Sequence, residues 1–141
     1  MKKMLALMTV LCLAGCVQGL TGDSSFIGTW SGAESISLNS AAPTAANASV
    51  QIGDAGNGQL IISLCPDGSG PLATATDDTD LEVEAITCPP AATSTCASAS
   101  LAIQGGTASL SSLGALSLSV TGTLTGCGSI EPFSVSFTGS M

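Results

Sequence analysis

Basic residues are almost absent from this 141-residue sequence. Its only two cationic side chains are Lys2 and Lys3, ten acidic residues follow them, and the chain contains neither histidine nor tyrosine. Nucleic-acid binding is excluded because it needs cationic side chains against phosphate. Nucleophile pairs that use histidine, Schiff-base lysines and histidine-ligated zinc lack their residues. Carboxylates remain as the only catalytic groups, and we expect neither a cofactor nor a bound metal.

The first apolar run is too short to cross a bilayer. Lys2 and Lys3 precede the apolar stretch Met4–Leu13, whereas a membrane-spanning helix needs about twenty residues. Small and turn-forming residues follow the stretch. A positive start, a short apolar centre and a small-residue end are typical of a secretory leader.

The leader ends in Leu13-Ala14-Gly15-Cys16, which resembles the lipobox of bacterial lipoproteins. The resemblance implies a diacylglyceryl group on the Cys16 sulfur and cleavage before Cys16 by signal peptidase II. An ordinary leader with a chance cysteine is the alternative. In that family Asp after the cysteine retains the protein at the inner membrane, and Val17 stands there instead, which favours the outer membrane of the cell envelope. We therefore expect a signal peptide at 1–15, a lipidated cysteine and flexible tether at 16–25, and a β-domain at 26–141.

Polar and apolar residues alternate through most of the remaining sequence. In 116–125, for example, apolar side chains share one face and Ser and Thr share the other. One buried apolar face and one solvent-exposed polar face are typical of antiparallel sheets. Short glycine-rich connections predict an all-β fold, a single antiparallel meander that forms a small barrel or a flattened sandwich. About eight strands are expected, near 26–38, 48–53, 58–65, 81–87, 97–104, 107–112, 115–125 and 132–138.

Glycine-rich dipeptides predict hairpin turns between these strands. Gly105-Gly106 suits a two-residue hairpin that would place Ile103 opposite Ala108. A second hairpin is expected around 126–131 and would place Leu124 opposite Phe133. A third is expected at 53–58.

Four cysteines follow Cys16, and in an exported protein an even number predicts disulfides. The expected strand directions put Cys65 and Cys127 at one end of the sheet, and Cys88 and Cys96 at the other. We therefore predict the disulfides Cys88–Cys96 and Cys65–Cys127. A Cys65–Cys88 bond would have to span the length of a strand. A zinc site of four thiolates has little support because no Cys-x-x-Cys spacing occurs.

Gly28-Thr29-Trp30 opens the first expected strand and resembles the Gly-x-Trp motif of lipocalin-type barrels. In that family the tryptophan closes the barrel floor, so the resemblance implies that Trp30 forms the floor of a ligand cavity. The alternative is that Trp30 is an ordinary core anchor, because large aromatics dominate small cores.

Two groups of carboxylates are candidate sites. The segment 77–84, Asp-Asp-Thr-Asp-Leu-Glu-Val-Glu, holds five, but it lacks the spacing of a calcium loop and is interpreted as a solvated strand face. Glu34 and Glu131 would be the pair of a carboxylate-based hydrolase. Glu34 shares the parity of the apolar residues of its strand, so it is expected to point inward.

Together these patterns predict a lipid-anchored β-domain of the cell envelope with a non-catalytic structural or binding role. Its partners would be the membrane, through the anchor, and an envelope protein, a glycan or a small apolar ligand. The first alternative is a lipocalin-like carrier of a small apolar ligand. The second alternative is a carboxylate-based hydrolase.

Overall fold

The structure is a computed structural model that describes residues 22–92, 96–126 and 128–141. The only helix in these residues is the 3-10 helix η1, Gly22–Ser25. It is not long and apolar enough to cross a membrane. The last four residues of the expected tether therefore form one helical turn. The strands are β1 (Gly28–Leu38), β2 (Thr44–Gly56), β3 (Gln59–Ile62), β4 (Leu72–Ala75), β5 (Asp80–Val83), β6 (Ile86–Thr87), β7 (Ala99–Leu110), β8 (Leu116–Gly126) and β9 (Ser129–Ser140).

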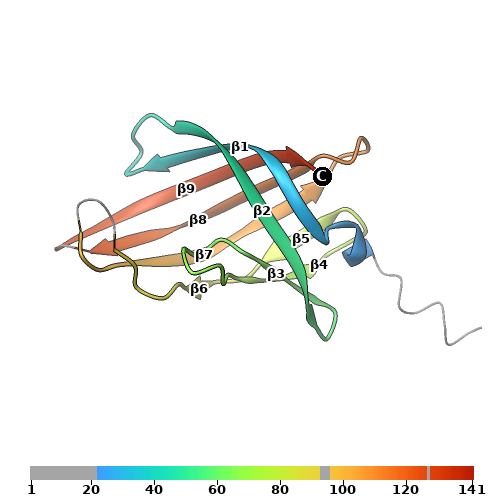
Figure 1. Ribbon diagram of the computed structural model, residues 1–141, viewed down its shortest axis with the longest axis horizontal. Coiled ribbons are helices and arrows are strands. Elements are labelled where there is room, and N and C mark those ends of the chain that lie inside the picture. The colour runs from blue at the N-terminus through green and yellow to red at the C-terminus, as the bar shows by residue number, and fades with distance from the viewer. Residues whose placement is uncertain (1–21, 93–95, 127) are drawn as a thin grey trace, which may run out of the picture.

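All nine strands belong to one antiparallel sheet, so the predicted all-β meander is confirmed. Neighbours in sequence pair along the order from β1 to β5 and from β7 to β9. In addition, β1 pairs with β9 and β5 pairs with β7, so the series of hydrogen-bonded strands closes on itself. Figure 1 shows the consequence, in which β1 and β2 cross over β7, β8 and β9 and form a second layer.

The inner face of this sheet holds an apolar core. Trp30, Phe26 and Phe137 are its largest fully buried side chains. Alternation along the strands supplies it, because Leu116, Leu118 and Val120 are buried while the serines between them are exposed. The outer face of β8 and β9 carries Ser and Thr at those alternate positions.

The stretch between β3 and β7 differs from the prediction. The segment 66–80 was expected to be a loop, but it contains β4, which pairs with β3 and β5. Only one strand was expected at 81–87, and it is divided into β5 and β6, which both pair with β7. The four residues of β4, Leu-Ala-Thr-Ala, are too few to show a clear alternation of polar and apolar side chains. Between a proline-containing turn and an acidic turn, they were therefore not recognised as a strand.

The hairpin predicted at Gly105-Gly106 is wrong, because β7 runs through it as one strand. The register with β8 shifts between Ile103 and Gly105, which is a β-bulge, and Gly105 has φ 143°. A bulge inserts one residue, so the inward positions change from odd numbers at Ile103 to even numbers at Ala108. A hairpin and a bulge thus produce the same reversal of alternation in the sequence.

The other two predicted hairpins exist. The β2–β3 turn places Asn57 and Gly58 at φ 58° and 75°, the left-handed geometry of a tight two-residue hairpin turn. In the β8–β9 hairpin Leu124 lies opposite Glu131, two positions away from the predicted partner Phe133. A two-residue shift leaves every side chain on its expected face.

Both predicted disulfides are wrong, because Cys65 is bonded to Cys88, with an S–S distance of 2.01 Å and Cα atoms 5.5 Å apart. The unpredicted strand β4 explains the error. It adds one reversal of chain direction after Cys65, so that Cys88 returns to the same end of the sheet. Cys96 is disulfide-bonded as well, and Cys127 lies outside the described residues.

Candidate functional site at the open end of the sheet

The two ends of the sheet differ. The end that carries η1, which we call the closed end, is filled by Phe26 and Trp30, with exposed fractions of 0% and 1%. The Trp30 indole N–H donates a 2.8 Å hydrogen bond to the carbonyl oxygen of Phe26. This bond satisfies the polar atom of a buried tryptophan and fastens the segment after η1 across this end.

At the opposite end, which we call the open end, the described residues leave the inner face uncovered. Along β1 the inward positions change from buried Trp30 to Ile36 and Leu38, which are 36% and 41% exposed. Along β2 they change in the same direction, from buried Val50 to exposed Ala46. β3 explains the difference, because it pairs with β2 only from Ile52 onward, and no other described strand pairs with the rest of β2 on that side.

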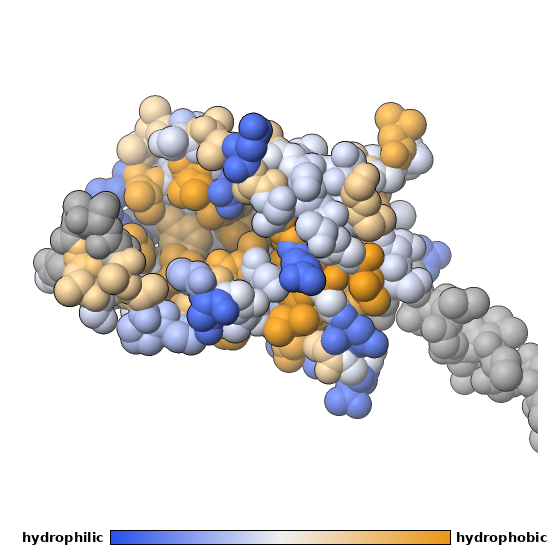
Figure 2. Space-filling model, viewed as in Figure 1, coloured by the Kyte–Doolittle hydropathy of each residue, from blue (hydrophilic) through white to orange (hydrophobic). Residues whose placement is uncertain are grey.

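An apolar pocket of about 180 Å³ lies at the open end. Its walls come from four segments, which are the start of the β3–β4 connection, the loop after β6, the start of β7 and the end of β8. Figure 2 shows apolar colours inside the hollow at the left of this face, where the open end lies in Figure 1. The pocket is lined by Pro66, Pro89, Ala91, Ala92, Ala99, Leu101 and Leu124.

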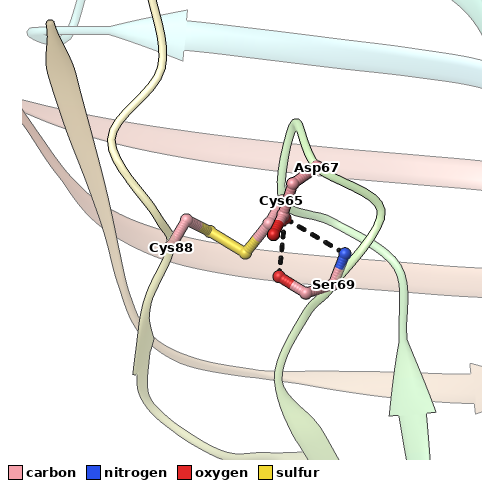
Figure 3. The surroundings of a disulfide bond; sticks show 4 residues. All are labelled: Cys65, Asp67, Ser69 and Cys88. Atoms are coloured by element: carbon pink, nitrogen blue, oxygen red, sulfur yellow. Dashed lines mark hydrogen bonds between the residues drawn. A yellow bond between two sulfur atoms is a disulfide. The ribbon is translucent and has the colours of Figure 1, made fainter.

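The Cys65–Cys88 disulfide joins two walls of this pocket, because Pro66 and Pro89 directly follow its cysteines (Figure 3). The turn after Cys65 is closed by a hydrogen bond from the Cys65 N–H to the Ser69 carbonyl oxygen, 2.8 Å. Within it the Asp67 carboxylate accepts from the Ser69 hydroxyl at 2.6 Å and from the Ser69 N–H at 3.1 Å. These bonds, the hydroxyl first, lower the pKa of Asp67 from its ordinary value of 3.8.

Trp30 does not line the pocket, although the resemblance to lipocalins implied that it is a cavity floor. It lies six residues along β1 from Ile36, about 20 Å at the usual rise of a strand. Its position in the packed core agrees with the core-anchor interpretation, and any cavity floor at the open end is formed by other residues.

Glu34 and Glu131 are not brought together. Glu34 lies opposite Phe137 on β9, and Glu131 is six residues away along β9, which corresponds to about 20 Å. Carboxylate pairs of glycosidases are about 5–10 Å apart. Glu34 shares the inward parity of Trp30, as predicted, but it is only half-buried because it lies toward the open end.

The acidic segment 77–84 forms the β4–β5 turn and the strand β5. Glu82 and Glu84 are exposed and alternate with buried Leu81 and Val83, which confirms the interpretation as a solvated strand face. Among residues 22–92, 96–126 and 128–141, no three acidic, cysteine or histidine side chains form a cluster that would hold a metal ion.

The lipobox and Cys16 lie outside the described residues, so lipidation stays a prediction. Sequence reasoning missed the pocket at the open end. The sequence did contain one indication of the pocket, because Pro66 and Pro89 each directly follow a cysteine. This indication could be recognised only with the correct pairing of these two cysteines. The chain matches no family model, no curated protein and no solved structure.

Proposed function

We propose that this chain is a lipid-anchored binding domain of the cell envelope, without catalytic activity, and that its open end receives a small apolar ligand. The observation that carries the proposal is the apolar pocket at the one end of the sheet where the inner face is uncovered. Its seven lining residues are all prolines, alanines and leucines. A site of this composition recognises a ligand by burial of apolar surface.

The size of the pocket restricts the ligand. At about 180 Å³ it is close to the cavities of about 150 Å³ that hold benzene and below the range of about 300–1,000 Å³ of drug-sized sites. One ring or a short alkyl chain fits this volume. The chain carries a formal net charge of −8, which repels anions, so the ligand is neutral or cationic.

A lipocalin-like carrier is the form of this function that the arrangement favours. The closed ring of strand pairings supports a small barrel, with η1 and Trp30 at one end and the pocket at the other. This arrangement supports the resemblance of Gly28-Thr29-Trp30 to the motif of lipocalin-type barrels, with the ligand held at the end away from the tryptophan.

The anchor would orient this pocket. Five residues separate Cys16 from η1, and this stretch reaches at most about 20 Å, whereas β1, with eleven residues, is about 36 Å long. Acyl chains on Cys16 would therefore hold the closed end near the bilayer. The open end would then face away from the membrane, toward a ligand that arrives from the aqueous side.

A Cys16→Ser variant tests the anchor. We expect the parent chain to incorporate labelled palmitate, to lose its first fifteen residues, and to fractionate with membranes. The variant should keep Lys2 and Lys3 and carry no label, because the sulfur that receives the lipid is gone. Globomycin, which blocks signal peptidase II, should preserve the leader of the parent. A variant that is labelled and cleaved like the parent contradicts lipidation at Cys16.

Neutral primary alcohols of increasing chain length test the pocket. Saturation-transfer NMR on the purified protein should detect binding that strengthens with chain length until the pocket is filled. Leu101→Trp fills the space and should abolish binding. Leu113→Trp is the matched control, because Leu113 is 94% exposed in the turn at the closed end, and it should bind like the parent. Equal binding to both variants contradicts a ligand site at the open end.

A further inference from the structure

The part of β2 nearest the open end is an exposed sheet edge. β1 pairs with β2 as far as Thr44, but β3 pairs only from Ile52 onward. The last backbone bond that we find on the β3 side is from the Ser63 N–H to the Gln51 carbonyl oxygen, 2.9 Å. Residues 44–50 therefore have a neighbouring strand on one side only within the described residues.

The direction of the free backbone groups follows from that bond. In an antiparallel strand the N–H and C=O of one residue point to the same side, and alternate residues point to opposite sides. Since Gln51 points toward β3, Ala45, Asn47 and Ser49 also point to that side, where β3 no longer runs. Their three N–H and three C=O groups form the exposed edge.

This edge lacks the usual protection against pairing. Another partly unpaired strand, β6, is only two residues long and is followed by Pro89 and Pro90, and short length and proline block edge-to-edge contacts. Residues 44–53 contain no charged residue and no proline, and Pro43 lies just before them, outside the seven residues of the edge. An open depression lined by Ser31, Gly32, Asn47, Ala48 and Ser49 lies over the paired strands β1 and β2, so the sheet face next to the edge is open as well.

We propose that this edge pairs with the same edge of a second copy of the chain. The sequence Thr-Ala-Ala-Asn-Ala-Ser-Val of 44–50 is self-complementary when two copies lie antiparallel about a two-fold axis through Asn47. Ala45 of one copy then lies opposite Ser49 of the other, and each Asn47 lies opposite its counterpart. All facing side chains are small or neutral, which suits an isologous contact.

Charge favours a second copy at this edge over other surfaces of the molecule. Two chains with ten acidic residues each repel one another. The nearest carboxylate along β2 is Asp54, seven residues from Asn47, and the nearest on the neighbouring strand β1 is Glu34, which lies opposite Ala46. In the pair, both β2 strands would lie between the two copies of Glu34 and separate them by about 14 Å, whereas contact through β5 would oppose Glu82 or Asp80.

Cysteine cross-linking of the full-length protein in cells tests this proposal. In a pair about Asn47 the two Cα atoms would be about 5.5 Å apart, within reach of a disulfide. Asn47→Cys should therefore give mostly covalent dimers on a non-reducing gel. The control Ser119→Cys has the same exposure on the central strand β8, where no edge exists, and should stay monomeric.

Charge variants test the same contact without a new thiol. Asn47→Asp would oppose two carboxylates and should raise the dimer dissociation constant at least tenfold in analytical ultracentrifugation of the purified full chain in detergent. Ser119→Asp adds the same charge away from the edge and should leave the constant unchanged. An unchanged near-ultraviolet circular dichroism spectrum shows that each variant is folded.

Three results would overturn the proposal. The first is a parent chain that stays monomeric at every concentration. The second is equal cross-linking of Asn47→Cys and Ser119→Cys. The third is a covalent adduct of Asn47→Cys with a different protein and none with itself, which would assign the edge to an extended segment of another partner.

Discussion

The closed and open ends of the sheet are built from the same strands, yet one end is packed and the other is not. On β1 the inward position 30 is 1% exposed, and the inward position 38 is 41% exposed. Alternation in the sequence is equally clear at both ends. It determines which face a side chain occupies, but burial also requires a neighbouring strand, and β3 is too short to reach the open end.

The largest effect should come from the closed end. Trp30→Ala removes the largest buried side chain and its hydrogen bond to Phe26, and should lower the free energy of unfolding by about 3–5 kcal/mol. Urea denaturation followed by circular dichroism measures this, since Trp30 is the only tryptophan. Thr29→Ala, an exposed neighbour, should stay within about 0.5 kcal/mol of the parent. A loss below 1 kcal/mol for Trp30→Ala would show that this end is not the packed one, since the expected loss is about threefold larger.

The stability of the open end should depend on the Cys65–Cys88 disulfide more than on the packing of side chains. Replacing both Cys65 and Cys88 by serine removes a disulfide with a sequence separation of 23 and should lower the free energy of unfolding by about 3 kcal/mol. The same variant should bind neutral alcohols more weakly, because the bond holds Pro66 and Pro89 in the pocket walls. An unchanged denaturation midpoint together with unchanged binding would contradict this role of the disulfide.

The same contrast explains which parts of the fold the sequence predicts. Long strands with regular alternation, β1, β8 and β9, were found near their predicted ranges. The stretch from β4 to β7 was not, since β4 is four residues long and the bulge at Gly105 imitates a hairpin. Counting strand directions then carried the error from β4 into the disulfides. The pocket was beyond prediction because its walls come from four separate segments.

Equal truncations at a packed position and at an uncovered position give a direct measure of the comparison. Leu118→Ala, at a position that is 2% exposed, should cost about 2–5 kcal/mol of unfolding free energy. Leu38→Ala, at 41% exposure, should cost less than about 1 kcal/mol. Denaturation curves of both variants measure the difference. Equal losses would mean that Leu38 is covered in solution, as it would be by a partner at the open end.

The smallest effects concern one aspartate turn at each end. Asp67 at the open end and Asp77 at the closed end both have a lowered pKa, from hydrogen bonds donated by Ser69 and Thr79. A lowered pKa in the folded state stabilises the protein above the ordinary value of 3.8 and loses its effect as the pH falls through the lowered value. Asp67→Asn should therefore be slightly less stable than the parent at neutral pH, and this difference should vanish in strong acid.

The two turns differ in which donor dominates, and this difference can be measured. The Ser69 hydroxyl is the main cause at Asp67, whereas the Thr79 backbone N–H is the main cause at Asp77. Ser69→Ala should therefore raise the pKa of Asp67 more than Thr79→Val raises the pKa of Asp77, because the first substitution removes the main donor and the second leaves the main donor in place. Carboxyl carbon shifts in an NMR titration give both values. A larger rise at Asp77 would mean that its side-chain bond to Thr79 dominates, and that the two turns do not differ in this way.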